Sequence, residues 1–102
     1  MKENKDQQIQ IELTEEVAQG TYSNLAVISH SSSDFVIDFI RVVPGVPKAK
    51  VKSRIILTPE HAKRLLHALT ENVERFEKQY EQIKVSNQDG FILPINGAIG
   101  EA

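Results

Sequence analysis

Three apolar runs separated by polar turns occupy the middle of the chain. Residues 22–30, 34–43 and 50–57 each read as a β-strand, and the second of them is the strongest because it is rich in Val, Ile and Phe. A serine-rich cluster separates the first two runs, and a Pro-Gly-Val-Pro loop ends the second, because proline donates no ladder hydrogen bond. This spacing predicts an antiparallel meander.

The turn centres predict how these strands pair. A first hairpin centred on Ser32 pairs Val27 with Ile37 and Leu25 with Phe39, and a second centred on Val46 pairs Ile37 with Ile55 and Asp38 with Arg54. One face is then the predicted core face: Leu25, Val27, Phe35, Ile37, Phe39, Val51, Ile55 and Leu57. The other face holds more aliphatic side chains than a solvated face normally does, so we expect something to cover part of it: Ile28, Val36, Ile40, Val42 and Ile56.

A long amphipathic helix follows the third run. Thr58 is a typical N-cap, and Pro59 and Glu60 suit the first helical turn. An apolar row then recurs at alternating spacings of four and three as far as Ile83, which predicts a helix over Pro59–Lys84 of about 39 Å. The predicted fold is α+β: an antiparallel β-meander of three to four strands followed by one long α-helix packed on one face. Its predicted core is Leu25, Phe35, Ile37, Phe39, Ile55, Leu57, Ala62, Leu66 and Leu69.

The two ends of the chain carry weaker patterns. Residues 1–8 are polar and charged, and we expect them to be disordered; Ile9–Leu13 alternates like a short strand, and Thr14 begins a helical turn that ends before Gly20. A single domain over residues 9–84 is expected, with a C-terminal tail over 85–102. The apolar segment Phe91–Ile95 in that tail is either an added edge strand or an arm that reaches a partner.

Composition limits the classes of protein. The 102 residues contain no cysteine and carry a net charge of −2, which excludes a disulfide framework, a thiolate zinc site and a globally basic nucleic-acid binder. No run is long and apolar enough to span a membrane, and the N-terminus lacks the apolar core of a secretory signal. A cytoplasmic location is therefore expected.

One segment is locally basic on this acidic chain. Residues 21–57 carry a net charge of +3, and four basic side chains alternate along the third strand, so they are predicted to point the same way: Lys48, Lys50, Lys52 and Arg54. Such a row is a candidate contact for an anionic partner, either nucleic acid or an acidic protein. It equally suits protection of an edge strand, with Arg54 paired to Asp38.

The sequence predicts no catalytic, metal or cofactor site. His61 and His67 lie six residues apart and point in different directions from a helix, whereas a helical metal pair needs a spacing of four. The serines at 31–33 lack the glycine-flanked strained turn that a serine nucleophile needs and lie in a turn, and no glycine-rich phosphate loop occurs. We therefore expect a protein that is not an enzyme.

Surplus apolar surface predicts self-association. The predicted helix outruns its sheet by about two turns, and one face of the sheet keeps its aliphatic side chains. The predicted interface of a homodimer or larger oligomer is Val73, Phe76, Tyr80, Ile83, Val36, Ile40 and Val42. A protein-interaction or scaffold module is the first hypothesis for function. The alternatives are a nucleic-acid binder that uses the basic strand and a chaperone-like binder of unfolded segments.

Five stretches carry a family resemblance: Tyr22–Asn24, Asp34–Phe39, Arg54–Lys63, Leu69–Asn72 and Phe76–Glu77. Because of these stretches, residues 12–83 resemble the short bacterial and archaeal proteins grouped as domain-of-unknown-function family 3467. The resemblance implies a small cytoplasmic protein, a β-meander followed by one long helix, and no assigned activity. It also implies a characteristic setting for five polar residues: Asn24, Asp38, Arg54, His61 and Asn72.

Overall fold

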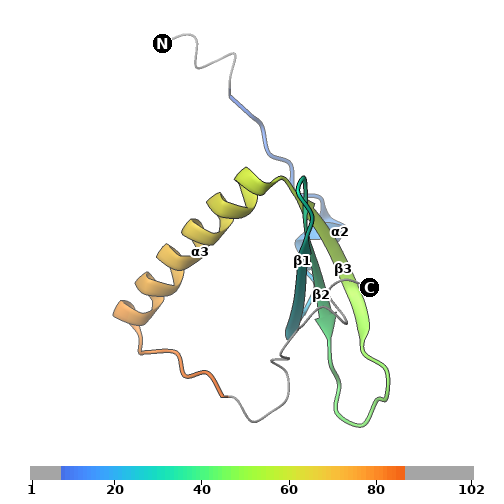
Figure 1. The fold of residues 1–102 in the computed structure, drawn as a ribbon. Helices are drawn as coiled ribbons and strands as arrows, with labels where there is room; N and C mark the ends of the chain where they lie inside the picture. Colours follow the sequence, from blue (N-terminus) through green and yellow to red (C-terminus); the bar gives the residue numbers. More distant parts are fainter. Residues whose placement is uncertain (1–7, 87–102) are drawn as a thin grey trace.

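A computed structural model describes residues 8–86 as a sheet with one long helix. The elements in chain order are a helical turn α2 (Glu15–Ala18), strands β1 (Leu25–His30), β2 (Phe35–Arg41) and β3 (Lys50–Leu57), and helix α3 (Pro59–Gln79). The strands form one antiparallel sheet in the order β1-β2-β3. Helix α3 begins where β3 ends and diverges from the sheet along its length (Figure 1). The predicted α+β fold, a meander followed by one long helix, is confirmed.

A short serine turn sets the register between β1 and β2. The N–H of Ser31 donates to the carbonyl of Asp34 at 2.9 Å, and the Ser31 hydroxyl accepts the N–H groups of Ser33 and Asp34 at 3.2 Å each. The two-residue loop pivots between Ser32 and Ser33, so His30 faces Phe35. The predicted pivot on Ser32 is therefore wrong by half a residue.

This small error reverses the faces of β1. Leu25 lies opposite Ile40 instead of Phe39, and Val27 lies opposite Asp38 instead of Ile37. Because side chains alternate along a strand, a register change of one residue moves every side chain of β1 to the other face. Leu25 and Val27 therefore leave the predicted core face.

The second hairpin keeps the predicted register along most of its length. Ile37 faces Ile55 and Asp38 faces Arg54, as expected from a pivot at Val46. Gly45 supplies the positive φ of 85° that the loop requires. The register shifts by one residue between Phe39 and Ile40, which is a β-bulge in β3.

The sheet thus has two faces, which we name after central residues of β2. The Ile37 face carries Ala26, Ile28, Phe35, Ile37, Phe39, Ser53, Ile55 and Leu57, and the Asp38 face carries Leu25, Val27, Val36, Asp38, Ile40, Val51, Arg54 and Ile56. The buried apolar side chains among the described residues are Val27, Ile40 and Ile37, each at most 9% exposed. The core is therefore small and divided between the two faces.

The predicted strand at Ile9–Leu13 does not form. These residues have no regular structure, and their apolar side chains are exposed. Alternation supplies a possible face for a strand but not the neighbouring strand whose backbone must complete the ladder. The predicted helical turn does form as α2, where the Thr14 hydroxyl accepts the N–H of Val17 at 3.2 Å.

Other expectations about the chain ends concern residues that the structure does not describe. The segment 1–8, predicted to be disordered, falls outside the described residues except for its last position. The Phe91–Ile95 segment and nearly all of the predicted tail over 85–102 also fall outside them.

Helix α3 begins as predicted and ends earlier. The Thr58 hydroxyl accepts the N–H of His61 at 3.2 Å, and Pro59 occupies the first turn. The helix ends at Gln79 and not at Lys84, because the backbone of Tyr80 leaves the helical conformation, with φ −114° and ψ −87°. Beyond this point the N–H of Ile83 donates to the Glu77 carboxylate at 3.0 Å. At 21 residues, α3 is about 32 Å long and exceeds the roughly 26 Å of β3 by one turn and not two.

The predicted core is largely wrong because α3 leaves the sheet. Contacts between α3 and the sheet are few, and α3 has no buried residue. Of the nine predicted core residues only Ile37 is buried; Leu25, Phe35, Phe39, Leu57 and Ala62 are half-buried, and Ile55, Leu66 and Leu69 are exposed. The amphipathic pattern identified the apolar face of the helix correctly, but not the surface that covers it.

Candidate interaction surface

An asparagine extends the β1–β2 ladder beyond the strand ends. The Asn24 side-chain amide donates to the carbonyl of Val42 at 3.0 Å and accepts the N–H of Val42 at 2.8 Å, while its own backbone N–H donates to Ile40. The hydroxyl of Ser23 lies within hydrogen-bond distance of the carbonyls of Leu25 and Ile40, at 3.1 Å each. The side chain of Asn24 therefore makes the two hydrogen bonds with Val42 that the backbone of a strand residue would otherwise make. No pattern in the sequence predicts this role, because asparagine is common in the turns that flank strands.

Asp38 and Arg54 form the predicted cross-strand ion pair. Arg54 donates from Nε to Oδ1 at 2.7 Å and from Nη2 to Oδ2 at 2.8 Å, a bidentate arrangement on the Asp38 face. The aspartate side chain is only 15% exposed, and that of the arginine is 61% exposed. The hydrogen bonds from Arg54 hold the pKa of Asp38 below its usual value, although partial burial acts in the opposite direction. The same hydrogen bonds raise the pKa of Arg54.

This pair predicts a loss of stability in acid. The pKa of Asp38 is lower in the folded chain than its ordinary value of 3.8, so the unfolded state binds more protons near that pH. The pair stabilises the fold above about pH 4–5, and this contribution disappears as the pH falls through the lowered pKa. Denaturant unfolding between about pH 6 and pH 3 should show a shallower pH dependence for Asp38→Asn than for the wild type. Asp34→Asn, in the exposed turn, is the control and should keep the wild-type slope; identical slopes for all three proteins would contradict the prediction.

The β-bulge divides the basic strand. Val51 faces Ile40 and Arg54 faces Asp38, so three residues of β3 span the same distance as two residues of β2. Lys52 is the extra residue and has no partner in the register. The alternation that would align four basic side chains is therefore interrupted.

The four basic residues consequently do not share one direction. Lys50 faces Arg41, on the opposite face of the sheet from Arg54. Lys48 lies in the loop before β3, and Arg54 is held by its carboxylate partner. The guanidinium carbon of Arg41 lies over the ring of Tyr22, 5.7 Å from its centroid. The predicted common direction is wrong, and what remains is a dispersed group of exposed lysines at an edge strand, which suits edge protection.

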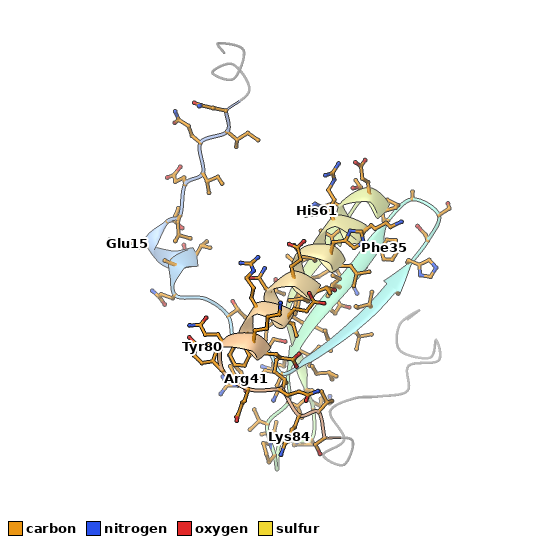
Figure 2. The ribbon with its side chains drawn as sticks, turned by 90° about the vertical axis from the view of Figure 1, so that its left-hand side faces the viewer. Glu15, Phe35, Arg41, His61, Tyr80 and Lys84 are labelled. Carbon is orange, nitrogen blue, oxygen red and sulfur yellow. The ribbon has the colours of Figure 1, made fainter. Side chains whose placement is uncertain are left out.

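The apolar stripe of α3, which we define as Ala62, Leu66, Leu69, Val73, Phe76 and Tyr80, is the most prominent uncovered surface. Leu66 and Leu69 are about 60% exposed, and Tyr80 is 65% exposed. The ring centroids of Phe76 and Tyr80 lie 4.9 Å apart, and both side chains line a shallow hollow at the end of the helix. Figure 2 shows His61 and Tyr80 at opposite ends of α3, so the stripe extends along nearly the whole helix.

The residues of the predicted interface are distributed unevenly. Val73, Phe76 and Tyr80 lie on the stripe, but Ile83 lies beyond the end of the helix and is not in phase with it. On the sheet, Ile40 is buried within the single chain, and Val36 and Val42 are half-buried. The exposed aliphatic side chains of the strands are instead Ile28, Val51, Ile55 and Ile56.

Comparison with protein families identifies the family of this chain. A family model described as a protein of unknown function, DUF3467, matches residues 1–85. The chain belongs to the DUF3467 family. The match includes the whole sheet and α3. Comparisons with curated proteins and with solved structures find no match to this DUF3467 chain.

The remaining polar residues of the family resemblance have local roles in this DUF3467 chain. Asn72 donates to the carbonyl of Ala68 at 2.8 Å, one turn earlier in the helix, and Thr70 bonds Leu66 in the same way. His61 contributes its backbone N–H to the N-cap of α3. No group of three or more potential metal ligands occurs in residues 8–86 of the DUF3467 fold. None of the helices in those residues combines the length and apolar content of a membrane span.

Side-chain ion pairs along α3 are sparse. Arg64 Nη2 lies 2.6 Å from Glu60 Oε2, across one turn of the helix. The same spacing of four separates Glu71 from Arg75 and Glu74 from Lys78, but no ion pair joins these residues in the described part of the chain. Exposed pairs of this kind contribute only about 0.3–0.5 kcal/mol each, so they do not account for the stability of a long helix with few tertiary contacts.

Proposed function

We propose that this DUF3467 chain is a non-enzymatic, self-associating protein-interaction module whose contact surface is the apolar stripe of α3. The observation that carries the proposal is a helix of 21 residues with a continuous apolar stripe and no buried residue. Most helical stability in proteins comes from packing an amphipathic face against another surface. The sheet of the same chain supplies little such packing, because its contacts with α3 are few.

A second copy of the chain is the simplest partner. A two-fold contact buries the same surface on both copies, so one stripe satisfies two chains. Monomeric proteins rarely expose contiguous apolar patches beyond a few hundred Å². A cytoplasmic location goes with this proposal, since a chain without cysteine needs no oxidising compartment.

The nucleic-acid alternative receives less support. It depended on four basic side chains in one row, whereas the bulge at Lys52 interrupts that row and Arg54 is engaged by Asp38. No stacking aromatic residues accompany the lysines of β3. The chaperone-like alternative depended on an apolar second face of the sheet, where Ile40 and Val27 are already buried.

Light scattering on the full chain at micromolar concentration tests the proposal. We expect about 23 kDa, twice the 11.5 kDa of one chain, or a larger multiple of that mass. Dilution should shift the mass toward one chain, because association follows mass action. A single species of 11.5 kDa at every concentration would contradict the proposal.

A further inference from the structure

We propose that two copies of α3 pair antiparallel, about a two-fold axis that crosses the helix between Leu69 and Val73. This inference rests on the proposed function and adds the orientation and register of the contact. The residues of the stripe are spaced by four, three, four, three and four, which is the spacing of the core positions in a coiled-coil seam. Over the stripe these spacings average 3.6 residues, which is one turn of a straight α-helix, so a short seam can form without supercoiling.

The sizes of the side chains favour the antiparallel orientation. About the proposed axis, Ala62 meets Tyr80 of the second copy, Leu66 meets Phe76, and Leu69 meets Val73. No layer then stacks two aromatic rings or two small side chains. A parallel pair in register would instead place Ala62 against Ala62 and Tyr80 against Tyr80, which leaves a gap at one end of the seam and crowding at the other.

The charges beside the seam favour the same orientation. On one flank lie Lys63, Thr70 and Glu77, and in an antiparallel pair this flank meets itself. Lys63 of each copy then lies opposite Glu77 of the other, which gives two ion pairs of opposite charge. A parallel pair brings this flank against the other one, Leu65, Asn72 and Gln79, and forms no ion pair.

The polar residues near the axis are compatible with contact. Thr70 and Asn72 each donate to a carbonyl of their own helix at 2.8 Å, so the Thr70 hydroxyl and one N–H of the Asn72 amide stay satisfied when water leaves the seam. Lys63 forms no ion pair in the described part of the chain and is free to reach the second copy. Glu77 uses Oε2 to accept the N–H of Ile83, and Oε1 remains for Lys63 of the second copy.

A charge exchange between the two positions tests the register. Lys63→Glu and Glu77→Lys each replace both ion pairs of a homodimer by like-charge contacts, so each variant alone should self-associate about tenfold more weakly. Mixed in equal amounts, the two variants form a heterodimer in which both pairs are again of opposite charge. The mixture should therefore recover the wild-type mass in light scattering at the same total concentration.

Matched controls use residues on the outer surface of α3. Lys78→Glu and Glu74→Lys make the same charge changes away from the seam and should leave self-association unchanged. Because Glu77 also accepts a hydrogen bond from Ile83, circular dichroism should confirm that the helix content of Glu77→Lys is retained. The variant Lys63→Glu/Glu77→Lys in one chain should associate with itself as the wild type does.

The outcomes separate this inference from the proposed function. Weakening by each single variant and recovery in the mixture support the antiparallel register. A wild type that associates while the mixture of variants does not recover would overturn the register and leave the self-association standing. A wild type that remains a single chain would overturn both.

Discussion

Replacing Leu69 by glutamate is expected to convert the self-associated protein into single chains of 11.5 kDa. Leu69 is 59% exposed in one chain, so the fold of that chain has little need of it. At the centre of a helix pair, however, the substitution buries two unpaired carboxylates in each dimer. Burying these carboxylates costs several kcal/mol. A loss of roughly 4 kcal/mol in binding free energy corresponds to a Kd about 1,000-fold higher. Light scattering over a range of concentrations measures the change.

The control for this substitution lies one residue earlier. Ala68 is exposed on the outer surface of α3, so Ala68→Glu introduces the same charge on the same helix without entering the stripe. The Ala68→Glu protein should keep the wild-type mass. If Leu69→Glu also kept that mass, the contact would have to lie elsewhere, and the exposed aliphatic side chains of the sheet would become the next candidates: Ile28, Ile55 and Ile56.

Truncating Ile37 to alanine is expected to reduce the free energy of unfolding by about 2–5 kcal/mol. Ile37 is 9% exposed and lies between Ile28 of β1 and Ile55 of β3, so the cavity left by its side chain is bounded on two sides by neighbouring strands. With so few buried apolar residues in the described chain, each contributes a large share of the stability. Urea unfolding at one fixed protein concentration measures the loss, because the self-association that we propose would make stability depend on concentration.

A matched isoleucine serves as control for Ile37. Ile11 is 89% exposed and belongs to no strand, so Ile11→Ala removes the same atoms from a site with almost no packing. Its effect should stay within about 0.5 kcal/mol. Equal losses for the two variants would contradict the assignment of Ile37 to the core.

Part of the interaction surface was predictable and part was not. Val73, Phe76 and Tyr80 were identified from their helical spacing alone, and they do lie on one exposed stripe. Ile83 has the same spacing, but the helix ends before it because the backbone leaves the helical conformation at Tyr80. The sequence shows the period of a pattern, whereas the residue at which the backbone turns away from the helix is seen only in the structure.

Local chemistry by itself determined the start of α3, the bounds of β3 and the Asp38–Arg54 pair. Each of these depends on residues close in the chain or joined by one hairpin, such as the Thr58 hydroxyl over its own first turn. The sequence therefore determined the order and type of the main elements. It also marked which side of the helix is apolar.

Tertiary structure alone decided which faces meet. The pivot between Ser32 and Ser33 reversed β1, and the bulge at Lys52 separated Lys50 from Arg54. Both changes involve a single residue, yet side-chain direction alternates at every residue, so a shift of one reverses a face. Whether the sheet covers the apolar stripe of α3 likewise depends on the direction in which the helix leaves β3. An amphipathic pattern predicts that an apolar stripe packs against another surface, and only the divergence of α3 from the sheet shows that the sheet leaves most of this stripe uncovered.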